Sequence, residues 1–211
     1  MTRLIDIGLE RISQMVLLMA EIAQKTVDTS VEAYLRGKEQ MEKVDAWSHE
    51  LRNLQEEIAE LALEVIAWYQ PVASDLRYVR ACMEIAYGFS RFGRYAYDIA
   101  QVLHIWPDLT GCNKNEIESM ARIVSQMIRT SVKAFADRDA RLGVEAFRMD
   151  DEVDAIMKQA LERIASNLSP DARCDVPQLL VMRYLERIAD HAAYIGEAVS
   201  YVVTGTPTPR L

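Results

Sequence analysis

The sequence predicts an all-α protein built from two tandem three-helix bundles. Three observations support this: the composition favours helices, breaking residues leave six long segments, and the second half repeats segments of the first. Only 8 of the 211 residues are glycine and 6 are proline, and half of the chain is hydrophobic, which is enough to build a core. No segment alternates between apolar and polar residues as a half-buried strand does.

Helix-breaking residues divide the chain into six helices. The expected helices span residues 3–35, 38–69, 73–105, 113–136, 139–167 and 176–204. Ser74 or a neighbour is expected to cap the third helix. Asp175 is expected to cap the sixth, where Pro177 lies in the first turn and needs no N–H partner. Long helices joined by short loops pack antiparallel, and the tail, residues 206–211, is expected to be flexible.

An internal repeat groups the six helices into two sets of three. Residues 29–34 (TSVEAY) recur as residues 130–135 (TSVKAF), and residues 90–94 correspond in position to residues 186–190. Each set also ends its second helix at a proline. The repeat predicts one bundle over residues 1–106 and a second over residues 112–205.

Charge and cysteine content restrict the class of protein. The net charge of −8 argues against a nucleic-acid partner, because phosphate binding needs a basic surface. Cys82, Cys112 and Cys174 are widely spaced and form no CxxC pair, so we expect free thiols in a reducing compartment and no thiolate zinc site. The N-terminus lacks the long apolar core of a signal peptide. We therefore expect a soluble, cytoplasmic protein.

Acidic residues of the last two helices are placed to meet. Glu186 and Asp190 are four residues apart in one helix, so their carboxylates lie about 6 Å apart on one face and repel. Asp154 and Glu186 are equally distant from Pro170, as are Asp150 and Asp190. Residues equidistant from the turn of an antiparallel hairpin lie at the same height. All four carboxylates should therefore face one another.

Four converging carboxylates need either a cation or raised pKa values. Oxygen ligands suit hard cations such as Mg²⁺, Ca²⁺, Mn²⁺ or iron, so we expect a metal site formed by Asp150, Asp154, Glu186 and Asp190. The alternative is a solvated charged face, in which the acids pair with Arg148, Arg183 and Arg187.

These motifs resemble the PhoU family, regulators associated with phosphate transport. The resemblance rests on residues 150–154 (DDEVD), 184–191 (YLERIADH) and 70–77 (QPVASDLR), and extends over nearly the whole chain. It implies two tandem three-helix bundles with acidic metal-binding motifs, and a regulator of phosphate uptake or phosphate-responsive signalling that is not an enzyme. It also implies docking to a phosphate transporter's ATPase subunit or a membrane sensor kinase. We expect a homodimer, with iron, manganese, magnesium or zinc at one site in the second bundle.

The first repeat departs from this pattern. Ser90 and Arg94 stand where the motif has its glutamate and aspartate. On the partner helix, mirroring about Pro71 gives Arg52 and Ser48, an ungapped alignment gives Asn53 and His49, and neither choice supplies two carboxylates. The first bundle therefore lacks the metal site, and Arg94 would supply positive charge in its place. Asp98 and Glu84 are expected to pair with Arg94.

Two other classes of function stay open at this stage. One is a carboxylate-bridged metalloenzyme in a helical bundle, such as an oxidase or a hydrolase. Dinuclear oxidases use Glu-x-x-His pairs, and this chain has none, since His49, His104 and His191 are isolated. The other is a metal-free structural adaptor for another transporter.

Overall fold

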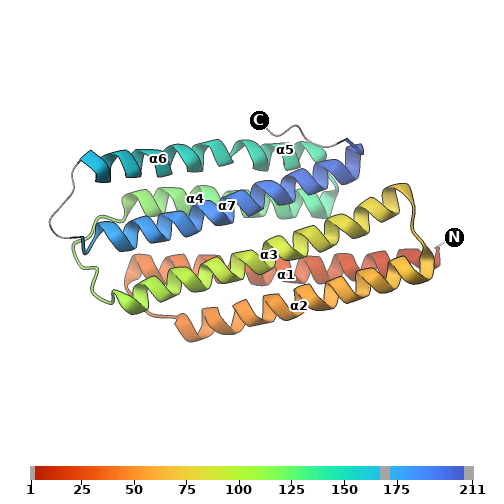
Figure 1. Ribbon diagram of the computed structural model, residues 1–211, viewed down its shortest axis with the longest axis horizontal. Helices are drawn as coiled ribbons and strands as arrows, with labels where there is room; N and C mark the ends of the chain where they lie inside the picture. Colours follow the sequence, from red (N-terminus) through yellow and green to blue (C-terminus); the bar gives the residue numbers. More distant parts are fainter. Residues whose placement is uncertain (1–2, 167–171, 207–211) are drawn as a thin grey trace.

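The computed structural model describes residues 3–166 and 172–206, and every regular element in these ranges is a helix (Figure 1). In chain order the helices are α1 (Leu4–Arg36), α2 (Met41–Tyr69), α3 (Ala73–Ile105), α4 (Asn115–Asp137), α5 (Ala140–Arg148), α6 (Asp150–Ser166) and α7 (Asp175–Thr204). The predicted all-α fold is confirmed, and α5 and α6 together make the predicted fifth helix. No helix of the described residues is long and apolar enough to cross a bilayer.

The break between α5 and α6 is a single residue, Met149. Its backbone stays in the right-handed helical region, with φ −69° and ψ −18°, and its carbonyl accepts a tight turn bond of 3.2 Å from the Glu152 N–H. The new helix then begins with Asp150, Asp151 and Glu152. Negative side chains are favoured at a helix N-terminus because the macrodipole is positive there, which gives a physical reason for a start at this point.

Two of the predicted caps are wrong. The N-cap of α3 is Val72 and not Ser74, because the helix already begins with a bond of 3.2 Å from the Asp75 N–H to the Val72 carbonyl. The N-cap of α7 is Cys174, and Asp175 is its first helical residue. The Asp175 carboxylate lies 3.8 Å from Arg163 instead, and Pro177 is buried near the helix start as expected.

The first and third helices of the first repeat pack against their counterparts in the second. α1, α2 and α3 contact one another, α4 to α7 form the second group, and the groups meet through α3 with α7 and α1 with α4. At the centre of this seam, a Cβ atom added to Gly88 would lie 3.1 Å from the Ile195 side chain. The missing side chain at Gly88 therefore lets α3 and α7 approach closely.

The repeated segment has the same local chemistry in both copies. Ser30 and Ser131 are fully buried, and each hydroxyl donates a 2.9 Å bond to the carbonyl three residues earlier, Val27 or Ile128. A buried hydroxyl is costly without such a partner. The matching bonds support an internal duplication, whereas the exact domain bounds stay a prediction.

The expectation of three free thiols is wrong. Cys112 and Cys174 form a disulfide, and only Cys82 is a free, buried thiol. Cys112 lies in the α3–α4 connection and Cys174 at the start of α7, and the fold brings these distant segments together. An ion pair of 3.7 Å between Arg173 and Asp108 joins the same two segments.

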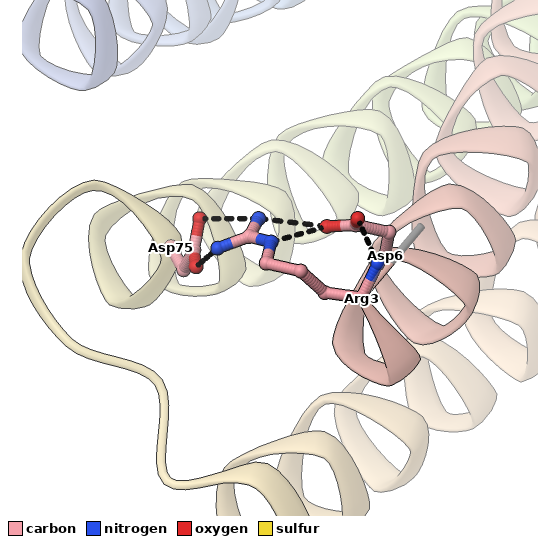
Figure 2. A network of polar contacts seen from close by, with 3 residues as sticks. All are labelled: Arg3, Asp6 and Asp75. Atoms are coloured by element: carbon pink, nitrogen blue, oxygen red, sulfur yellow. Dashed lines mark hydrogen bonds and ion pairs between the residues drawn. The ribbon is translucent and has the colours of Figure 1, made fainter. Parts of the chain in front are cut away.

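The opposite end of the molecule is held by a charged bridge (Figure 2). The Arg3 guanidinium lies between two carboxylates, 2.7 Å from Asp75 at the start of α3 and 2.7 Å from Asp6 in α1. The Asp6 carboxylate also accepts a bond of 2.8 Å from the Arg3 backbone N–H. The bridge thus ties the first turn of α1 to the first turn of α3.

Candidate metal centre

The four predicted acids lie on two helices that pack together. Asp150 is the first residue of α6 and Asp154 lies one turn further on, while Glu186 and Asp190 occupy successive turns of α7. Burial raises the pKa of Asp150 to about 7, and the neighbouring charges of Asp190, Asp154 and Glu186 add to the shift. The structure therefore brings all four carboxylates within electrostatic reach of one another.

The pKa values of Asp154 and Glu186 are shifted in the same direction. Burial raises the pKa of Asp154, and repulsion from Asp190 and Asp151 raises it further. Burial also raises the pKa of Glu186, and the Arg183 charge partly opposes that shift. Asp151 thus belongs to the charged environment of the cluster. It is not among the four acids predicted from the sequence, and its position directly after Asp150 is the signal that could have identified it.

One carboxylate oxygen of the cluster is a buried acceptor without a donor. The Oδ1 atom of Asp150 is buried and has no hydrogen-bond partner. A buried acceptor without a partner typically costs about 1–3 kcal/mol. A cation bound between α6 and α7 would satisfy this oxygen and offset the repulsion, and oxygen donors of this kind suit a hard metal ion.

The side chains as they stand do not form a finished metal site. Within residues 3–166 and 172–206, no group of three or more His, Cys, Asp or Glu side chains could hold a metal ion. Arg183 pairs with Glu186, and Arg187 lies 3.2 Å from Asp190. These arginine side chains are 44% and 46% exposed. Exposed pairs within one helix contribute only about 0.3–0.5 kcal/mol, so a cation could displace them.

His191 has a packing role beside the cluster. Its ring lies 6.0 Å from the rings of both Tyr87 and Tyr95 on α3. Burial lowers the pKa of His191, and the nearby Arg91 charge lowers it further. The neutral ring forms part of the α3–α7 interface and lines a groove of about 520 Å³ next to Asp190.

The corresponding place in the first repeat carries an arginine. Arg94 lies 3.1 Å from the nearly buried Asp98 carboxylate, as expected. The expected pairing with Glu84 is wrong, because Glu84 pairs at 2.9 Å with Arg80, one turn earlier on the same helix.

α2 and α3 also approach closely here. A Cβ atom at Gly93 would lie 3.2 Å from the Cα of Ser48, which places Ser48 at the height that mirroring about Pro71 gives. The nearby motif positions, Ser48, Arg52, Ser90 and Arg94, offer no carboxylate. This region therefore lacks the four-acid chemistry of the second repeat.

Comparisons with known proteins agree with the repeat and the fold. A family model described as the PhoU domain matches residues 16–103 and again residues 117–199. The phosphate-specific transport system accessory protein PhoU homolog of Clostridium acetobutylicum is 31% identical, and the match covers 97% of each chain. A homolog with the same description from Methanothermobacter thermautotrophicus is 28% identical over 88% of this chain and 89% of the relative.

Solved structures show the same architecture. The crystal structure of PhoU from Pseudomonas aeruginosa superposes with a TM-score of 0.90 at 26% identity, covering 95% of this chain and 99% of that one. A phosphate transport system regulatory protein PhoU from Streptococcus pneumoniae also reaches 0.90, at 20% identity, which bears on the fold alone. The Clostridium and Methanothermobacter relatives are described as accessory proteins of a phosphate-specific transport system and not as enzymes, in line with the sequence-based expectation. With two domain matches and a full-length relative, this chain belongs to the PhoU family.

Proposed function

We propose that this chain is an accessory protein that regulates phosphate uptake or phosphate-responsive signalling. The observation that carries the proposal is the match to a phosphate transport accessory protein over 97% of both chains. The chain would act in the cytoplasm, as a homodimer, by docking to a phosphate transporter's ATPase subunit or to a membrane sensor kinase.

We also propose that Asp150, Asp154, Glu186 and Asp190 bind iron, manganese, magnesium or zinc. The unpartnered Asp150 oxygen and the raised pKa values of its neighbours support this assignment. A bound cation would supply positive charge to the cluster and would not take part in a reaction.

A bound metal ion would strengthen the attachment of α6 to α7. α6 buries only Val153, Met157 and Ala160 of its 17 residues, so its attachment to the core is limited. The four acids lie on the side where α6 meets α7, and joining them through a cation would fasten the two helices. Metal binding would thus tune the shape of the second repeat.

A double variant, Glu186→Gln with Asp190→Asn, tests the metal assignment. A cation that binds only the folded state adds about 2.7 kcal/mol at a hundredfold excess over Kd. The variant removes two repelling charges but keeps side-chain volume. It should melt at or above the metal-free wild-type temperature and should lose most of the shift that metal produces.

The matched control neutralises Glu118 and Glu162, exposed acids outside the cluster. Glu118→Gln with Glu162→Gln should keep the full metal-induced rise in melting temperature. If the Glu186/Asp190 variant also keeps the full rise, the four acids are a solvated charged face and the metal assignment fails.

The docking proposal is tested with partners from the same organism. The purified chain should retain the ATPase subunit of the phosphate transporter, or the phosphate sensor kinase, in a pull-down. Removal of the gene should change phosphate uptake or the response of phosphate-controlled genes to starvation and repletion. Absence of both binding and phenotype would contradict the proposed function.

A further inference from the structure

Large apolar side chains are exposed together at one end of the first repeat. Leu4, Trp68 and Val72 are each 73% exposed, and Ile7 and Leu76 are also exposed. We call these five residues the apolar end patch. Soluble monomers rarely expose a group of large apolar residues unless it has a function, and tryptophan gains the most from burial at an interface.

The three segments that carry the apolar end patch are fixed to one another. The Arg3 bridge to Asp75 joins the starts of α1 and α3 at 2.7 Å (Figure 2). A Cβ atom at Gly8 would lie 2.7 Å from Val65 and 3.9 Å from Tyr69, so the end of α2 packs on the first turns of α1. Figure 1 shows these three helix ends at the same end of the molecule. The patch is therefore held in place by defined contacts.

A row of glutamates leads along α2 to the apolar end patch. Glu56, Glu60 and Glu64 follow one another at four-residue spacing, and Trp68 is the next residue in the row. All three acids are exposed, and none makes an ion pair within the described residues. We call Glu56, Glu60 and Glu64 the acidic row.

The acidic row is unfavourable in the free chain. Like charges four residues apart repel by a few tenths of a kcal/mol per pair, and negative charge is disfavoured toward the C-terminal end of a helix. Arg52 lies one turn before Glu56, and no Lys, Arg or His follows it up to residue 76, so the repulsion between Glu60 and Glu64 has no compensation nearby in the sequence. Positive charges on a partner would relieve this repulsion.

We propose that the apolar end patch and the acidic row together bind a basic amphipathic helix of a partner protein. Lys or Arg side chains at three- and four-residue spacing would face the acidic row, and a large apolar side chain would cover Trp68. The inference rests on the proposed function, for which it names the docking surface and the chemistry of the partner segment.

Charge argues against two other occupants. An anionic membrane surface would be repelled by the acidic row, since such surfaces attract basic segments. A symmetric pair of two copies through this surface would bring no positive charge to either acidic row, because a two-fold interface uses the same apolar and acidic surface on both copies. Neither argument applies to a basic protein segment.

The first test uses a fluorescent synthetic peptide with lysines at every fourth position beside a leucine stripe, and the full chain. Binding measured by anisotropy should weaken at least tenfold for Trp68→Ala and for Glu60→Gln with Glu64→Gln, and should weaken with salt. A peptide with glutamate in place of lysine should not bind. The matched control, Glu145→Gln with Glu162→Gln, removes two exposed acids elsewhere and should change the affinity less than twofold.

The second test uses the transporter ATPase subunit and the sensor kinase as probes. If either binds the wild type but not the Trp68→Ala chain, at unchanged melting temperature, the inference is supported. If either binds both chains equally, the docking surface is wrong while the proposed function stands, and if neither binds the wild type, the docking function itself fails. Anionic vesicle binding or self-association that depends on Trp68 would also overturn the inference.

Discussion

Asp150 is the side chain where burial and negative charge act together. It is the first residue of α6, one of its oxygens is buried without a partner, and three further carboxylates face it from α6 and α7. The dipole of α6 stabilises negative charge at this position, but burial outweighs that effect and raises the pKa of Asp150 to about 7. The residue is thus balanced between a protonated and an ionised form near neutral pH.

This balance predicts a pH-dependent stability in metal-free protein. The pKa of Asp150 is about 7 when folded against 3.8 for the free side chain, so the folded state holds the proton more tightly. Its stabilising contribution is complete below pH 3.8 and is lost as the pH rises through 7. In the presence of a chelator, the melting temperature of Asp150→Asn relative to the wild type should therefore rise from pH 4 to about pH 7 and then level off.

The control is Glu162→Gln, which changes an exposed acid outside the cluster. Its difference from the wild type should vary much less over the same pH range. If the difference in melting temperature between the wild type and Asp150→Asn is the same at every pH, Asp150 ionises normally in the folded protein.

At the scale of elements, α5 and α7 are held at the closest approach of two backbones. A Cβ atom on Gly196 would lie 2.4 Å from the Gly143 carbonyl oxygen, and the reverse distance is also 2.4 Å. Because backbone atoms meet, no side-chain rotation can relieve the clash. Gly196→Ala should lower the free energy of unfolding by about 1–3 kcal/mol, measured by denaturant titration.

Gly88→Ala is the matched control for this contact. Gly88 is also a buried helical glycine, but its added Cβ would meet the Ile195 side chain at 3.1 Å, and a side chain can shift. The loss of stability should be clearly smaller than for Gly196→Ala. Equal losses would mean that α5 and α7 can separate without much cost.

The Cys112–Cys174 disulfide closes a loop of 62 residues that contains α4, α5 and α6. Cross-links over loops of this length typically stabilise a fold by about 2–4 kcal/mol, chiefly by restricting the unfolded chain. Reduction of the wild type should therefore lower its melting temperature, and Cys174→Ser should melt at the lower temperature with or without reductant.

Cys82→Ala controls for effects of reductant on the free thiol. It should show the same fall on reduction as the wild type, since Cys82 is not bonded. A reductant effect that persists in Cys174→Ser would contradict the stabilising role of the disulfide. Because disulfides are rare in reducing compartments, thiol titration of protein taken directly from cells also tests the proposed cytoplasmic location.

Local chemistry explains which element boundaries the sequence could predict. Gly37 ends α1 with a left-handed φ of 64°, a conformation that glycine adopts readily. The break at Met149 has no glycine or proline to mark it, because the chain barely leaves the helical conformation there. The disulfide could not be predicted either, since its partners are distant in sequence and meet only through the packing of α3, α4 and α7.

At the scale of the whole molecule, antiparallel geometry explains why the acidic cluster could be predicted. The distance of a residue from the turn sets its height in a hairpin, so a turn predicted at Pro170 is enough to place Asp150 opposite Asp190, although Pro170 itself lies outside the described residues. The partners of exposed charges were less predictable. Glu84 and Arg94 are ten residues apart on α3, about 15 Å along the helix axis, which is too far for an ion pair, whereas Arg80 lies one turn from Glu84.

The two repeats should therefore differ in metal binding although they share one fold. In the second repeat, four carboxylates surround an unpartnered oxygen. In the first, Arg94 already places a fixed positive charge beside Asp98, and a cation there would be repelled. Crystals soaked with Mn²⁺, Fe³⁺ or Zn²⁺ should show anomalous density at the Asp150 cluster and none near Ser48, Arg52, Ser90 and Arg94.

The stoichiometry in solution should agree, with metal at one cluster in each chain. Arg94→Ala provides the sharpest comparison, because it removes the positive charge from the first repeat without adding a carboxylate. If charge alone excluded the cation, this variant would gain metal there. We expect no gain, because one aspartate cannot replace four oxygen-donor side chains, and equal metal density in both repeats of the wild type would contradict the asymmetry altogether.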